Sequence, residues 1–79
     1  MEKEKFEAML VLLVPQIVDL ITNRYQKDEV AAHREFYDSK VYSLLEKEET
    51  KLWHFSPLTL FNMFEEEKRT GNITFPEEA

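Results

Sequence analysis

Cysteine is absent from this 79-residue chain, and glycine occurs only once. Without cysteine, the fold cannot be held by disulfides or by a zinc site with thiolate ligands. A single glycine also excludes a glycine-rich loop that binds phosphate. A chain this short has room for only one hydrophobic core. We therefore expect a single helical domain, residues 1–79, stabilised by apolar packing and, if that is insufficient, by self-association.

Long apolar runs are also missing. The most apolar stretch, Met9–Val14, is followed by Pro15, Gln16 and Asp19, and falls far short of the ~20 residues that a membrane span requires. The residues before it carry mixed charge and no small-residue cleavage site follows, so the segment does not resemble a signal peptide. The sequence predicts a cytoplasmic protein with no membrane contact.

Basic residues are in the minority. Sixteen acidic residues against ten Lys and Arg give a formal charge of −6, and no cluster of bases interrupts this excess. Such a charge opposes approach to a phosphate backbone, so we expect no nucleic-acid partner. An apolar content of 43% is too high for a disordered chain.

Apolar residues recur at helical spacing in the first third of the chain. The recurring positions are Phe6, Leu10, Leu13, Ile17, Leu20 and Ile21. Further apolar residues fill the gaps between them, which is typical of a central helix covered on several sides. Pro15 lies inside the pattern and removes one backbone donor. Because the apolar stripe continues in register across Pro15, the sequence predicts one kinked helix rather than two.

Capping residues precede three further helical segments. The segments, with their caps, are 29–37 after Asp28, 40–47 after Ser39, and 57–70 after Ser56. Gly71 is a natural C-terminal cap for the last of these, and Ile73-Thr74-Phe75 is extended in character. The predicted fold is all-α: a compact bundle of about four helices, the first long and kinked at Pro15, with a short extended C-terminal tail.

Residues suited to catalysis or metal binding are few. Glu29 and His33 are one helical turn apart, and His54 could complete a ligand set. The interpretation that we favour is that Glu29 is an acid in the capping turn, His33 a half-buried polar residue and His54 part of a loop. Ser39 and Ser56 are explained as caps, and with only two histidines a Ser-His-Asp set would require residues far apart in the sequence to converge. We therefore predict no catalytic residues, no metal site and no cofactor.

Aromatic residues are concentrated between residues 36 and 64. The default interpretation is that they form the core of a small domain. Alternatively, some of them form an exposed surface, since Trp and Tyr combine a large apolar area with a polar tip. Our candidate binding patch consists of Tyr37, Tyr42, Trp53 and Phe55. Trp53 lies between polar residues, and we expect it to be partly exposed.

Three stretches carry a resemblance to a known group of proteins: VPQIVDLI, FYDSKVYSLLEKEETKLWHFSP and TGNITFPEE. From Val14 onward the chain resembles a family of short bacterial proteins, about 70–90 residues long, whose function is unknown. The resemblance covers about four fifths of the chain and is strongest at TKLWHFSP. It implies no activity and supplies no catalytic positions.

These observations favour a non-catalytic module for protein–protein interaction or regulation. A first helix that is apolar on more than one face needs more cover than three short helices easily supply, so we also expect homodimerisation. One alternative is an antitoxin-like neutraliser, whose acidic surface would cover a basic partner and whose affinity would fall steeply with salt. A small enzyme or metal-binding protein is the remaining alternative.

Overall fold

The computed structural model describes residues 2–73. Its elements, in order, are α1 (Lys3–Tyr25), α2 (Glu29–Tyr37), α3 (Lys40–Leu45), the 3₁₀ turns η1 (Glu48–Thr50) and η2 (Leu52–His54), and α4 (Pro57–Thr70). No strand occurs among the described residues. The predicted all-α fold, with about four helices and a long first one, is confirmed. The predicted extended tail falls almost wholly on residues 74–79, outside the described residues.

Local capping sets where three of the helices begin. Each capping side chain accepts a hydrogen bond from the backbone N–H three residues further on: Asp28 from Ala31 (2.8 Å), Ser39 from Tyr42 (3.1 Å) and Ser56 from Thr59 (3.2 Å). Gly71 ends α4 with a φ of 81°, a left-handed conformation that glycine adopts without strain. α2 and α4 therefore have the predicted bounds.

α3 is shorter than predicted, ending at Leu45 rather than near residue 47. The Thr50 hydroxyl donates to the Leu44 carbonyl (2.6 Å), and the Lys47 N–H donates to the same carbonyl (3.1 Å). These bonds satisfy a carbonyl that a longer helix would have used, and the chain leaves α3 through a tight turn. The stop comes from a residue five positions beyond the end of the helix.

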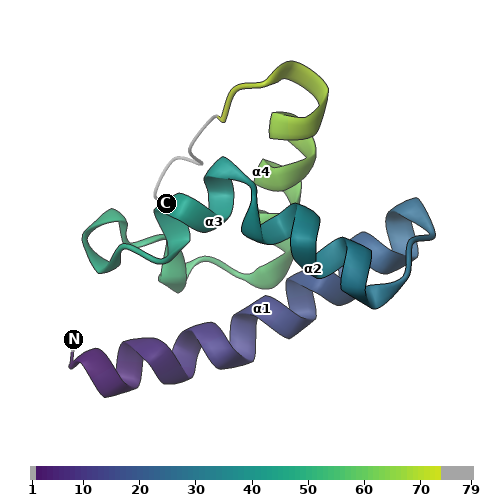
Figure 1. Ribbon diagram of the computed structural model, residues 1–79. Coiled ribbons are helices and arrows are strands. Elements are labelled where there is room, and N and C mark those ends of the chain that lie inside the picture. The colour runs from purple at the N-terminus through teal and green to yellow at the C-terminus, as the bar shows by residue number, and fades with distance from the viewer. Residues whose placement is uncertain (1, 74–79) are drawn as a thin grey trace.

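α1 runs without interruption through Pro15, as the sequence predicted. Proline lacks the N–H that would bond to the Val11 carbonyl. At the next residue, the side-chain amide of Gln16 donates to the Leu12 carbonyl (2.9 Å), which adds a hydrogen bond beside the one that Pro15 cannot form. Figure 1 shows the ribbon of α1 turning upward in its second half.

The core lies between α1 and the later elements, with α1 packing against α4, α2 and η2. Its largest fully buried side chains are Ile17, Val18, Ile21, Phe36, Val41, Leu45, Leu52, Leu60 and Phe64. In Figure 1, α1 lies along one side of the molecule and the other elements lie above it. Leu58, near the start of α4, lies outside this core and is 57% exposed.

One carboxylate joins α4 to the start of α3. The Glu67 side chain accepts hydrogen bonds from the backbone N–H groups of Lys40 (2.9 Å) and Val41 (3.1 Å). The Lys40 ammonium in turn donates to the Gly71 carbonyl (3.0 Å). The first backbone N–H groups of a helix have no partner within it, so an acid at the N-terminus of α3 satisfies them and complements the positive end of the helix dipole. A six-residue helix is thus held at its N-terminus by a residue that lies far away in the sequence.

A second carboxylate, Glu35, joins α2 to two other parts of the chain. The ammonium groups of Lys27, before α2, and Lys68, on α4, both donate to it. The hydrogen bond from Lys27, then that from Lys68, lowers the pKa of Glu35 below its ordinary value of 4.5, against the opposing effect of partial burial. Glu35 is therefore ionised in the folded chain at any pH where the unfolded chain ionises it.

This pair of contacts predicts a pH-dependent contribution to stability. Because the folded-state pKa of Glu35 is lowered, its contribution is fully present above the unfolded value and is lost as the pH falls through the folded value. We expect Glu35→Gln to lower the free energy of unfolding by about 1 kcal/mol at neutral pH. The free energies of unfolding that urea denaturation gives for the two proteins should differ at neutral pH and converge as the pH falls below 4.5 and through the lowered pKa of the folded chain. A difference in the free energy of unfolding that stayed constant from neutral to acidic pH would contradict an ionised Glu35 as its source.

Candidate functional site

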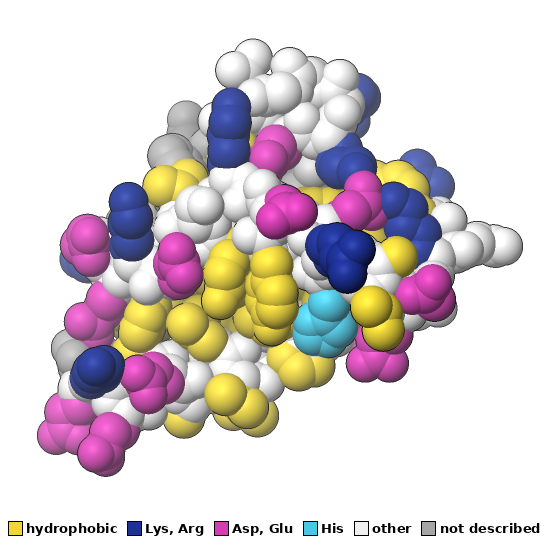
Figure 2. All heavy atoms as spheres, viewed as in Figure 1, with side chains coloured by type: hydrophobic (Ala, Val, Ile, Leu, Met, Phe, Trp, Pro, Cys, Tyr) yellow, Lys and Arg dark blue, Asp and Glu magenta, His cyan; other side chains and the backbone are white. Residues whose placement is uncertain are grey.

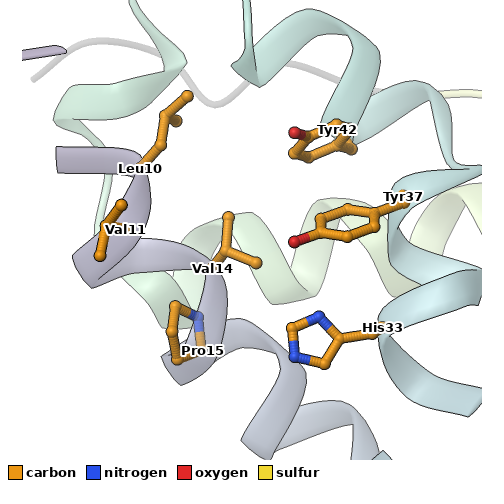
Figure 3. Close-up of a pocket in the computed structure, with 7 residues that line it drawn as sticks. All are labelled: Leu10, Val11, Val14, Pro15, His33, Tyr37 and Tyr42. Carbon is orange, nitrogen blue, oxygen red and sulfur yellow. The ribbon is translucent and has the colours of Figure 1, made fainter. Parts of the chain in front are cut away.

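An open groove of about 310 Å³ lies between α1 and the ends of α2 and α3. It is lined by Leu10, Val11, Val14, Pro15, His33, Tyr37 and Tyr42. Figure 3 shows Tyr37 and Tyr42 pointing from α2 and α3 toward α1, with Leu10 and Val14 lying across from them. The groove therefore has an aliphatic wall on one side and an aromatic wall on the other.

The aromatic wall is fixed to the core by ring contacts. The Tyr37 and Tyr42 rings have centroids 4.7 Å apart, and the Tyr42 ring meets Phe36 edge-on at 5.6 Å. Phe36 is fully buried and contacts Phe64 of α4 at 5.9 Å. His33 extends the wall, with its ring 5.5 Å from that of Tyr37. Such edge-on pairs favour a defined orientation, so the groove presents preformed rather than loose aromatic surfaces.

The two tyrosines of the groove differ in exposure, but both have free hydroxyls within the described residues. Tyr37 is 48% exposed, whereas Tyr42 is half-buried. Burial, followed by the nearby charge of Glu46 and the neighbouring Tyr37, raises the pKa of Tyr42 above its ordinary value. Its phenol is therefore neutral at physiological pH. Among the described residues, no hydrogen bond engages either tyrosine hydroxyl, so both are available to an incoming ligand.

His33 lines the groove on its α2 side, near an acid. Its Nε2 lies 4.0 Å from the Oε1 atom of Glu29, one turn earlier on α2. That separation is too long for a hydrogen bond. Within residues 2–73, no three His, Asp or Glu side chains gather where they could hold a metal ion. The groove thus offers apolar surface, two hydroxyls and an imidazole rather than a ligand set.

The other two predicted patch residues, Trp53 and Phe55, are not part of this groove. Both are half-buried and pack against the hydrophobic core. The Trp53 indole N–H donates to the Glu48 carbonyl (3.1 Å), which ties η2 to η1. Phe55 stacks on His54 at 4.4 Å. The structure therefore brings Tyr37 and Tyr42 together, and places Trp53 and Phe55 where they support the turns before α4.

The aliphatic wall continues onto the outer surface of α1. Val11 is 70% exposed and Leu12 is 64% exposed, and Pro15 is exposed beside them. Figure 2 shows hydrophobic side chains gathered in a band across this face of the molecule. By length and composition alone, α1 also meets the criterion for a membrane-crossing helix, as core helices of soluble proteins and signal sequences do. The fold therefore does not wrap α1 completely.

The groove could be only partly predicted from the sequence. Tyr37 and Tyr42 were predicted because exposed tyrosines are favoured at binding surfaces. Leu10, Val11, Val14 and Pro15 were not predicted as site residues, although the all-round apolar character of their segment signalled that some would remain uncovered. His33 was considered as a half-buried polar residue or a metal ligand, and not as part of a binding surface.

No protein-family model matches the chain, and neither the curated proteins nor the solved structures contain a significant match. This agrees with a resemblance that extends only to short proteins of unknown function. The comparisons supply no activity, ligand or partner, so any functional conclusion must come from the site itself.

Proposed function

We propose that this chain is a non-catalytic protein-binding module, and that the groove between α1 and the Tyr37–Tyr42 pair receives part of a protein partner. The observation that carries the proposal is the exposure of Tyr37 and Val11 on opposite sides of one preformed apolar groove. Tyrosine at a binding surface contributes large contact area at little cost in side-chain entropy. The two hydroxyls would add directional hydrogen bonds at the rim.

The chemistry of the groove favours an apolar side chain as the anchor of the partner. Leucine, methionine or phenylalanine on a partner helix or loop would fit between an aliphatic and an aromatic wall. A groove of about 310 Å³ suits one or two such side chains rather than a large cofactor. The partner would therefore bury an apolar anchor beside Tyr37, with polar contacts at the edge.

The principal test compares the affinity of the captured partner for three forms of the chain. Affinity capture from the native host identifies the partner, and titration calorimetry with that partner then measures binding. Tyr37→Ala should weaken binding about 30-fold, the loss expected when a central anchoring tyrosine is truncated by about 2 kcal/mol. Leu58→Ala is the matched control, because Leu58 is 57% exposed, against 48% for Tyr37, but does not line the groove.

Equal affinities of the Tyr37 and Leu58 variants would contradict a binding role for the groove. Salt dependence separates this proposal from an antitoxin-like neutraliser that recognises a basic partner. Apolar burial is little affected by salt, whereas charge complementarity is screened within ~8 Å at physiological ionic strength. Binding that disappears at high salt and ignores Tyr37→Ala would favour the neutraliser, which the net charge of −6 makes the second candidate.

A further inference from the structure

The outward side of α1 carries a regular stripe of exposed residues. They are Lys5, Ala8, Leu12, Pro15 and Asp19, spaced by three, four, three and four residues, and all are exposed. This is the spacing of a seam along which two helices pack. The middle of the stripe is apolar, and its two ends carry opposite charges. We refer to these five residues as the α1 seam.

The α1 seam is opposite to the buried side of the helix. The core-facing residues Leu13, Ile17 and Ile21 follow the other face of α1, and the remaining elements lie above that face in Figure 1. Leu12, at the centre of the seam, is 64% exposed. Within residues 2–73, neither Lys5 nor Asp19 forms an ion pair. The seam therefore presents an apolar centre and two unpaired charges to the solvent.

The charges of the seam are arranged symmetrically about its apolar centre. Lys5 and Asp19 each lie seven residues from Leu12, which corresponds to about 10 Å along the helix axis on either side. In an antiparallel pair of α1 helices centred on Leu12, each Lys5 would lie opposite the Asp19 of the second copy. A parallel pair would place lysine against lysine and aspartate against aspartate. The seam is thus self-complementary in one direction only.

We propose that the α1 seam is the interface of an antiparallel, two-fold symmetric homodimer. Leu12 packs on its symmetry mate at the two-fold axis, Ala8 allows the helices to approach closely, and Pro15 adds apolar contact. Two Lys5–Asp19 pairs close the ends of the interface. Self-complementary two-fold contacts of this kind are the commonest form of protein oligomer.

The extent of the seam sets the expected strength of the dimer. From Lys5 to Asp19 it extends for about 21 Å along the helix, and a single helix pair of that length lies at the low end of specific interface areas. The dimer is therefore reversible, with a dissociation constant in the micromolar range. It uses the outer side of α1 and shares only Pro15 with the groove, so both surfaces can be occupied together.

A second copy fits the seam better than a lipid surface does. Insertion of α1 into a bilayer would require the core residues Leu13, Ile17 and Ile21 to leave the hydrophobic core. The seam also carries an acid at one end, and the chain has a net charge of −6, which opposes an anionic membrane. Opposite charges placed at equal distances from Leu12 have no counterpart on a membrane surface.

The test is sedimentation velocity of the full chain from micromolar to millimolar concentration. The wild type should pass from monomer to dimer over this range. Leu12→Lys should weaken dimerisation at least about 30-fold, because it places two ammonium groups at the axis. Leu58→Lys, the matched control on α4, should leave it unchanged. Circular dichroism of each variant checks that the helices are retained.

Charge reversals test the antiparallel register itself. Lys5→Glu and Asp19→Lys should each weaken the dimer about 5- to 10-fold, since each replaces two attractive pairs with two repulsive ones. Asp19→Lys should do so even though it reduces the net charge of the chain. The double variant Lys5→Glu/Asp19→Lys keeps the net charge at −6 and should recover wild-type dimerisation to within about threefold.

Three results would overturn the proposal. They are a wild type that stays monomeric at every concentration, a double variant no better than the single ones, or equal effects of Leu12→Lys and Leu58→Lys. A test with vesicles of phosphatidylcholine and phosphatidylglycerol could also overturn it. If the monomeric chain bound these vesicles through Leu12, the seam would be a membrane-binding surface instead. Partner binding by Leu12→Lys reports on the groove separately, so failure of the dimer leaves the proposed function standing.

Discussion

Replacing Phe36 with alanine should remove a large share of the stability of the fold. Phe36 is fully buried, and its ring meets those of Tyr42 in α3 and Phe64 in α4. One side chain therefore holds α2 against the two helices that follow it. Truncation of a buried phenylalanine costs about 3–5 kcal/mol. A domain of this size has a total stability of only about 4–12 kcal/mol, so this single loss is a large share of it.

The adjacent residue provides the control for that prediction. Tyr37 follows Phe36 on α2, but is 48% exposed. Tyr37→Ala removes the ring contacts with Tyr42 and His33 but should lower the free energy of unfolding by no more than about 1 kcal/mol, because the side chain lies largely at the surface. Urea denaturation followed by circular dichroism measures both. If the two variants lost similar amounts of stability, the division between core and groove described above would be wrong.

Replacing Trp53 with alanine should lower the free energy of unfolding by about 2–3 kcal/mol, less than the replacement of Phe36. The side chain is half-buried against the core, and its indole N–H donates to the Glu48 carbonyl. Its loss removes packing beneath η2 and leaves that carbonyl without its donor. Trp53→Phe keeps most of the ring area and should cost about 1 kcal/mol, close to the value of one hydrogen bond.

The Trp53 variants also distinguish a role in stabilising the fold from a role in binding a partner. At temperatures where Trp53→Ala remains folded, its affinity for a partner should be close to that of the wild type. A variant with unchanged stability and lost affinity would place Trp53 in the binding surface, as the sequence alone led us to expect. Trp53 would then join Tyr37 and Tyr42 as a contact residue.

Helix positions were predictable from the sequence because their signals are local. Asp28 and Ser56 bond to backbone groups three residues away, and Gly71 ends α4 through its own conformation. The end of α3 was mispredicted because the Thr50 hydroxyl reaches back six residues to the Leu44 carbonyl. The hydrogen bond from the Val41 N–H to Glu67 joins residues more than twenty positions apart, and no short sequence pattern predicts it.

The candidate site was less predictable for a related reason. Phe36 and Tyr37 are neighbouring aromatic residues, and only the way α2 packs on α1 and α4 decides which one is buried. Periodicity assigns residues to faces within one helix, and does not say which face meets which partner. The uncovered part of α1 was foreseeable as a shortage of covering helices. Its position, beside Tyr37 and around Leu12, required the packed structure.

Photo-crosslinking in the native host tests the protein-binding role of the groove most directly. A photoreactive amino acid is placed at position 37 or 11, on opposite walls of the groove, or at position 58 as a control whose exposure lies between theirs. We expect positions 37 and 11 to capture the same partner protein, and position 58 not to capture it. Capture of that partner from position 58 alone, or the absence of any partner at 37 and 11, would contradict a protein-binding role for the groove.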